Sequence, residues 1–237
     1  LSSNFRQVAN IDLGIAPWNN GEGWMPIIQS PSWFSGTYDG NGYTISNLTI
    51  NRPLENYVGL FGRLYFASVS NVTFDNVNIT GNNQVGALVG WAGESNLTNI
   101  SINGSISGNG LVGGLVGSTS LLNINNCNSS GTINSTGDRT GGLTGDHYEN
   151  SITNNIYSSM IVTSTGNYTG GLFGTNEITS TVYNSYFLGS VSGKQNVGGI
   201  TGWLSNSIVN TCYSAGNVTG DSLAGALVGN MVNNSLI

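Results

Sequence analysis

Residues 113–117 of the chain read Gly-Gly-Leu-Val-Gly, and variants of this phrase occur seven times along the sequence. Each copy has Leu or Ile two residues before a closing glycine. The closing glycines are separated by 28, 27, 28, 29, 28 and 27 residues: Gly62, Gly90, Gly117, Gly145, Gly174, Gly202 and Gly229. A period this regular indicates one structural unit stacked on itself, as in a solenoid.

Three further sets of residues repeat in step with the glycines. The first is β-branched throughout and has small polar neighbours, which predicts an inward-facing strand position: Ile79, Ile106, Ile133, Val162, Val191 and Val218. The second is the apolar residue of the phrase itself: Leu60, Leu88, Leu115, Leu143, Leu172, Ile200 and Leu227. The third lies six residues before the first: Thr73, Ile100, Cys127, Ile156, Ser185 and Cys212. Three inward columns predict three short strands per coil.

Equivalent strands of successive coils meet in parallel, and parallel crossovers are right-handed in about 98% of cases. The sequence therefore predicts an all-β fold, a right-handed parallel β-helix of about 28 residues per coil. Four asparagines in register predict a ladder of stacked side-chain amides: Asn99, Asn126, Asn155 and Asn184. A β-propeller blade would need about 40 to 50 residues, and the consensus of a leucine-rich repeat is absent.

The two ends of the chain differ from the repeats. All four prolines fall in residues 1–56, which we expect to form an N-terminal cap with the first coil. Residues 57–237 are expected to form one continuous solenoid. No capping sequence follows the last repeat, so we expect either that the natural protein continues or that another molecule covers this end.

Composition narrows the class of protein. Charged residues make up 7% of the chain, against about 25% in an ordinary soluble domain. The net charge of -6 offers no cationic surface for nucleic acid, and no apolar run is long enough for a membrane-spanning helix. We therefore expect an extracellular or cell-surface protein without nucleic-acid partners and without membrane insertion.

The repeated phrase resembles the GLUG motif of secreted bacterial and archaeal repeat proteins. The resemblance rests on residues 58–62, 86–90 and 113–117 and their later copies, and on residues 210–218 between two of them. Residues 10–13, 23–27 and 34–42 are similar to the segment that precedes such repeats. The resemblance implies a surface location, as in adhesin-like proteins and in the non-catalytic region of metallopeptidases that cut immunoglobulin A1.

Catalytic and metal-binding patterns are sparse. The single histidine, His147, follows a repeat glycine and is expected in a solvated loop, where its replacement by Ala would leave folding intact. Without a second imidazole or thiolate at ligand spacing, we expect no metal, no cofactor and no catalysis. The acidic residues at 138, 146 and 149 with Arg139 are expected to be a solvated loop. Cys127 and Cys212 share a column three coils apart, roughly 14 Å, which is too far for a disulfide.

One set of aromatic residues suggests a binding surface. Phe74, Tyr157, Tyr186 and Tyr213 are assigned to one column, and the three tyrosines are consecutive in it. Such a stack either supports the sheet or forms a ridge for an extended ligand. If outward, it would suit a glycan or a peptide strand.

These observations favour a non-enzymatic surface module that acts as an adhesin or a structural stalk. Its expected partners are other surface proteins, glycans or copies of itself, and head-to-tail stacking into a filament or sheath is possible. The alternatives are an accessory non-catalytic region of a secreted peptidase and a β-helical carbohydrate-active enzyme.

Overall fold

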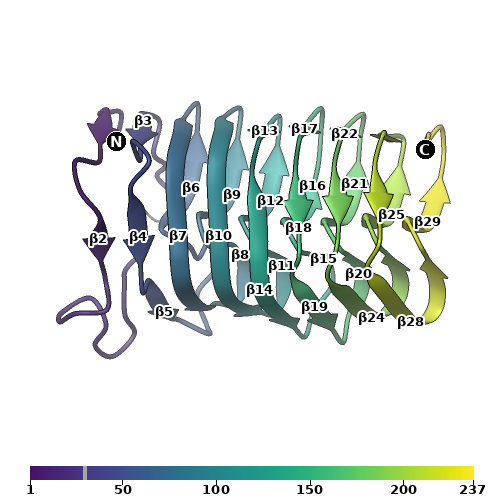
Figure 1. Ribbon diagram of the computed structural model, residues 1–237, viewed down its shortest axis with the longest axis horizontal. Coiled ribbons are helices and arrows are strands. Elements are labelled where there is room, and N and C mark those ends of the chain that lie inside the picture. The colour runs from purple at the N-terminus through teal and green to yellow at the C-terminus, as the bar shows by residue number, and fades with distance from the viewer. Residues whose placement is uncertain (29–30) are drawn as a thin grey trace.

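The computed structural model describes residues 1–28 and 31–237, so residues 29 and 30 of the predicted cap lie outside the described residues. The described chain is a parallel β-solenoid (Figure 1). In Figure 1 the near strands β2 (Ile11–Asp12) and β4 (Thr44–Ser46) run downward, while the rear strands run upward as the chain advances to the right. This makes the coil right-handed and confirms the predicted fold class.

One wall of the solenoid is a seven-stranded parallel sheet with one strand per coil within the described residues. Each of its strands begins one residue before the repeat glycine. Its strands are β6 (Phe61–Tyr65), β9 (Val89–Gly93), β12 (Val116–Ser120), β16 (Thr144–His147), β21 (Phe173–Glu177), β25 (Thr201–Ser205) and β29 (Val228–Val232).

The remaining walls belong to a second sheet of 22 strands in the described chain. Five of its strands turn corners: β7 (Ser68–Thr80) and β10 (Asn96–Gly108) each serve three walls, and β14 (Asn128–Ser135), β24 (Ser190–Gly198) and β28 (Asn217–Gly225) each serve two. The first wall also contains β1 (Phe5–Arg6), β3 (Thr37–Asp39), β13 (Asn123–Asn125), β17 (Ile152–Asn154), β22 (Thr181–Tyr183) and β26 (Ile208–Asn210). The next wall contains β2, β4, β18 (Tyr157–Ser158), β23 (Tyr186–Phe187) and β27 (Tyr213–Ser214). The third wall contains β5 (Thr49–Asn51), β19 (Ile161–Ser164) and the first residues of β24 (Ser190–Gly198) and β28 (Asn217–Gly225). The fourth wall contains β8 (Asn83–Val85), β11 (Gly110–Gly113), β15 (Thr140–Gly141), β20 (Asn167–Gly170) and the last residues of β24 and β28.

The number of strands per coil is larger than predicted. The coil from β16 to β20 contains five short strands rather than three. The two additional strands have buried columns of their own that the sequence analysis did not count. One column is Val69, Leu97, Ile124, Thr153, Val182 and Val209, and the other is Val85, Val112, Thr140, Thr169 and Val197.

The core is one continuous cluster that runs along the solenoid axis. The β-branched column from Ile79 to Val191 and the leucine column from Leu60 to Ile200 are buried throughout, as predicted. Val218 and Leu227, in the last coil, are partly buried against the same cluster.

One inward position was assigned wrongly, and the cause is a local irregularity. Thr73 is exposed, and Val72 takes its place opposite Ile100. The pairing of β7 with β10 shifts by one residue between Ile102 and Gly104, which is a β-bulge. Because β7 holds one extra residue there, counting six residues back from Ile79 lands on the outward side.

The predicted asparagine ladder is present at one corner of the coil. Asn126 donates through Nδ2 to Asn99 Oδ1 at 3.3 Å, and Asn155 donates to Asn126 at 3.2 Å. These three residues have φ between 53° and 56°, a left-handed conformation that asparagine tolerates better than most residues. Asn184 departs from the ladder, because its amide donates to Asn154 at 2.9 Å.

The N-terminal region is already built from parallel pairs. β1 pairs with β3 and β2 pairs with β4, and β3, β4 and β5 each pair with β7. The division at residue 56 stays a prediction. Over the described part of the chain, no helix has the length and apolar character needed to cross a membrane.

Replacing Ile133 by Asp tests the inward register. Ile133 is fully buried between Ile106 and Val162 of the adjacent coils. An unpaired carboxylate there should lower the free energy of unfolding by about 4 kcal/mol. The neighbouring exposed residue offers a matched control, since Asn134→Asp should change stability by less than about 0.5 kcal/mol. Equal urea midpoints for the two variants would contradict the register.

Candidate functional site

The outer face of the seven-stranded sheet carries the most varied side chains. In each strand the repeat glycine is second, the third residue faces outward and the fourth faces the core. The third residues lie in register along the sheet: Arg63, Trp91, Ser118, Asp146, Thr175, Trp203 and Asn230. This column brings together residues about 28 positions apart in sequence.

A neighbouring segment of the coil adds a second set of outward side chains. One residue of this segment in each coil has a positive φ, for example Tyr57 at 59°, Arg139 at 64° and Tyr168 at 60°. The left-handed backbone places these side chains beside the third-position column. The Arg63 guanidinium lies 5.2 Å from the centre of the Tyr57 ring, and the Tyr168 and Trp203 rings are 5.6 Å apart.

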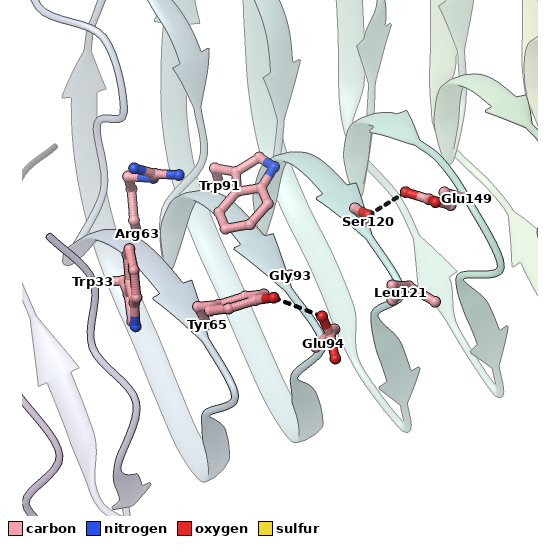
Figure 2. Close-up of a pocket in the computed structure, with 9 residues that line it drawn as sticks. All are labelled: Trp33, Arg63, Tyr65, Trp91, Gly93, Glu94, Ser120, Leu121 and Glu149. Carbon is pink, nitrogen blue, oxygen red and sulfur yellow. Dashed lines mark hydrogen bonds between the residues drawn. The ribbon is translucent and has the colours of Figure 1, made fainter. Parts of the chain in front are cut away.

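The first coils of this face enclose a hollow of about 420 Å³, which we call the aromatic hollow (Figure 2). It spans β6, β9, β12 and the turn after β16. It is lined by Trp33, Arg63, Tyr65, Trp91, Gly93, Glu94, Ser120, Leu121 and Glu149. The sequence analysis assigned none of these residues to a binding site, and it expected Glu149 to lie in a solvated loop. The available signal was the position directly after each repeat glycine, which holds two tryptophans in one outward column.

Aromatic rings form one side of the aromatic hollow. Trp33 packs edge-on against Tyr65 at 5.4 Å, and Tyr65 is 6.0 Å from Trp91. The Arg63 guanidinium lies 4.9 Å from the centre of the Trp91 ring, a cation–π contact that helps to fix the indole. A Cβ at Gly93 would lie 2.4 Å from the Trp91 ring, so glycine at this position lets the indole lean over the sheet.

Carboxylates form the opposite side. The Tyr65 hydroxyl donates to Glu94 Oε1 at 2.7 Å, and the Ser120 hydroxyl donates to Glu149 Oε2 at 2.8 Å (Figure 2). The hydrogen bond to Glu94 is the main cause of a raised pKa for Tyr65, because it stabilises the protonated hydroxyl. The aromatic hollow thus combines ring faces with acceptor oxygens held by hydrogen bonds.

The predicted tyrosine stack lies on a different wall, along β18, β23 and β27. Tyr157 and Tyr186 have ring centroids 5.4 Å apart and planes within 8°, and Tyr186 and Tyr213 have corresponding values of 5.1 Å and 7°. Tyr157 is 39% exposed and Tyr213 is 53% exposed. These three residues form an outward ridge, which we call the tyrosine ridge. Its binding role stays a prediction.

Phe74 does not belong to the tyrosine ridge. Its side chain is fully buried in the core and pairs with Ile102, and the outward position in its coil is Thr73. The cause is again the β-bulge in β7, which shifts the alignment by one residue. The ridge therefore begins at Tyr157, with Asn128 and Ser101 preceding it in the same column.

The expectation of a solvated loop for His147 is wrong. His147 ends β16, has no exposed surface and packs 4.8 Å from the Phe173 ring. Its Nδ1 is 2.7 Å from Asn176 Oδ1, and its Nε2 is 3.0 Å from the Thr153 hydroxyl. It occupies the inward fourth position of its strand, and burial lowers its pKa to about 4, although the contact with Asn176 acts in the opposite direction. The imidazole is therefore neutral at physiological pH.

The acidic group near Arg139 is a salt-bridge cluster rather than a solvated loop. Arg139 Nη1 is 2.9 Å from Asp146 Oδ1, which also accepts the Thr175 hydroxyl at 2.5 Å. Glu177 joins from the next coil, with its Oε1 3.6 Å from Arg139 Nη2. Burial raises the pKa of the Asp146 and Glu177 carboxyls, and the positive charge of Arg139 acts in the opposite direction.

Asp138 and Glu149 lie apart from this salt-bridge cluster. The Asp138 carboxylate accepts the backbone N–H of Asn167 at 2.7 Å, and Glu149 lines the aromatic hollow. No group of three or more metal-ligating side chains is found among residues 1–28 and 31–237.

Both cysteines have free thiols, as predicted. Cys127 is buried and burial raises its pKa to about 12, while Cys212 is partly exposed.

The fold and this surface define a parallel β-solenoid with patterned outer walls, and solved structures contain the same fold. The crystal structure of a "putative immunoglobulin A1 protease" from Bacteroides ovatus matches with a TM-score of 0.71. The match covers 100% of this chain and 78% of that chain at 18% identity, so it shows a shared fold. No family model matches the chain.

Two curated proteins are similar in sequence over part of the chain. Halomucin of Haloquadratum walsbyi is 39% identical over 111 residues, which are 44% of this chain and 1% of halomucin. The "Putative Gly-rich membrane protein" of Evansella cellulosilytica is 44% identical over 59 residues, which are 25% of this chain and 7% of that protein. The chain thus matches only a small part of the length of both relatives.

Acid should destabilise the protein through His147. Because its folded pKa of about 4 lies below the unfolded value near 6.5, the unfolded chain binds more protons between these values. The stability that the neutral imidazole contributes is present above pH 6.5 and is lost as the pH falls toward 4.

The variant His147→Leu isolates this effect, because Leu64 and Leu204 hold the same inward position in other coils. At pH 8 it should be less stable by about 1–3 kcal/mol, since Asn176 and Thr153 lose their partner. The deficit should narrow at pH 4.5. Urea unfolding at both pH values measures the difference in stability between the variant and the original protein. A difference that does not depend on pH would contradict the lowered pKa of His147 in the folded state.

Proposed function

We propose that this chain is a non-enzymatic module of an extracellular or cell-surface protein that acts in adhesion. The observation that carries the proposal is the tyrosine ridge, in which three outward rings stack in register on consecutive coils, with Tyr186 half-buried between the exposed Tyr157 and Tyr213. Exposed aromatic rings at a regular spacing suit extended partners, such as another surface protein, a glycan or a second copy of the chain. They do not suit a compact metabolite.

The side chains that could support catalysis are engaged in structural contacts, which supports a non-enzymatic role. His147 lies in the core between Asn176 and Thr153, and Asp146 is held by Arg139 and Thr175. A general base must reach a substrate, and a neutral buried imidazole with both ring nitrogens occupied is poorly placed to do so.

The relatives support the location. Similarity to halomucin and to a protein named as a membrane protein agrees with a surface or membrane-associated setting. Membership of the GLUG-motif repeat proteins is part of the same proposal, based on the seven repeated phrases. Polymerisation of copies into a filament is a further form that such adhesion could take.

A second candidate function is an accessory, non-catalytic region of a secreted peptidase. The fold match to the Bacteroides ovatus protein over the whole of this chain favours it. A peptidase domain encoded in the same polypeptide would support this candidate, whereas a longer run of repeats would support the adhesive module.

Replacing all three ridge tyrosines by Ser should abolish adhesion with little loss of stability, because outward rings bury little area on folding. The assay is the capture of module-coated beads by surfaces that carry the same module or an immobilised neutral polysaccharide. Thr163, Ser192 and Thr219 face outward on the same three coils, so their replacement by Ala is the matched control.

Undiminished capture by the tyrosine variant would reject the adhesive role of the ridge. Circular dichroism of the same variant decides the remaining alternative. A chain that no longer folds would show that the rings support the sheet.

A further inference from the structure

The aromatic hollow differs from the rest of its wall because of three fifth-position residues. In consecutive coils these are Tyr65, Gly93 and Ser120. The first of these positions has a large ring, the second has no side chain and the third has a small hydroxyl. The outer face of the sheet is therefore indented over one coil. The Trp91 indole leans into this space, held by Arg63 on one of its faces.

The two sides of the hollow have complementary chemistry. Trp33, Tyr65 and Trp91 offer apolar ring surface, while Glu94 and Glu149 offer acceptor oxygens across from it (Figure 2). A carboxylate has about four lone-pair sites, so Glu94 keeps acceptor capacity beyond its bond to Tyr65. A pyranose ring has a matching division, with a face of C–H groups and an edge of hydroxyl donors.

The charges in the hollow select among saccharides. Arg63 contributes one positive charge, and Glu94 and Glu149 contribute two negative charges. The Arg63 guanidinium is already placed over the Tyr57 and Trp91 rings. The resulting excess of negative charge opposes uronic acids and sulfated sugars, and favours chains without charge.

We infer that the aromatic hollow is a binding subsite for a neutral saccharide chain, with a sugar ring against Trp91 and its hydroxyls donating to Glu94 and Glu149. Its volume of about 420 Å³ falls in the range of ligand sites, about 300–1,000 Å³. The site lies on the seven-stranded sheet, whereas the tyrosine ridge lies on the other sheet. It is therefore a second site, independent of the ridge.

The test is calorimetric titration of the intact module with neutral hexasaccharides of glucose, mannose, galactose, xylose and N-acetylglucosamine. At least one should bind saturably, and a hexamer of glucuronic acid should bind more weakly. Trp91→Ala should raise the Kd by about ten-fold or more. Glu94→Gln, which keeps the shape of the side chain, should raise it by about five-fold.

Trp203→Ala is the matched control, because Trp203 lies in the same outward column as Trp91 but packs on Tyr168 away from the hollow. It should leave the Kd unchanged, as should the triple tyrosine variant. No binding across the neutral panel would overturn the inference. So would equal losses for Trp91→Ala and Trp203→Ala, equal affinity for the glucuronate hexamer, or a peptide strand that occupies the hollow in place of the sugars.

Discussion

The solenoid depends on a close approach between two backbone segments at the repeat glycines from Gly90 to Gly229. A Cβ at Gly117 would lie 2.5 Å from the carbonyl carbon of Gln84, and one at Gly145 would lie 2.5 Å from that of Leu111. Backbone atoms cannot move aside as a flexible side chain can, so any larger residue would force neighbouring coils apart. Because this contact recurs from coil to coil, the inward columns and the asparagine ladder fall into register.

Stacking in register makes the outer walls sensitive to single residues. Along one column of the seven-stranded sheet, Arg63 and Trp91 form a cation–π pair. Three coils further along the same column, Asp146 forms a salt bridge with Arg139. On the other sheet, three tyrosines at one position stack almost in parallel. The backbone is therefore regular, while the outward side chains differ from coil to coil. Substitution at an outward position changes the surface without disturbing the core.

The core tolerates polar residues where their partners stack with them. Thr119, His147 and Asn176 occupy the inward position that holds Leu64, Ala92 and Leu204 in other coils. The Thr119 and Ser151 hydroxyls are 3.2 Å apart, and Thr153 contacts His147. The amide nitrogen of Asn176 is buried without a hydrogen-bond partner among the described residues, and this lowers the free energy of unfolding.

The sequence by itself determined the coil, its period of about 28 residues, its parallel pairing and most of its inward residues. It did so because the same alternation of inward and outward residues occurs in seven repeats. A substitution that obscures the pattern in one repeat is recognised by comparison with the others. The stacked tyrosines and the free cysteines followed from the same register. The inward position of His147 did not, because a single polar residue two positions after a glycine looks the same in a loop and in a polar core.

Only the tertiary structure decided where the register slips and which outward residues meet. One extra residue in β7 turned Phe74 inward and Thr73 outward, and nothing in the local composition marks that bulge. The aromatic hollow joins Trp33 to Tyr65 and Trp91 across separate coils. Its shape depends on backbone angles and on the absence of a side chain at Gly93. The distances between its rings are set by the stacking of coils rather than by the spacing of residues along the chain.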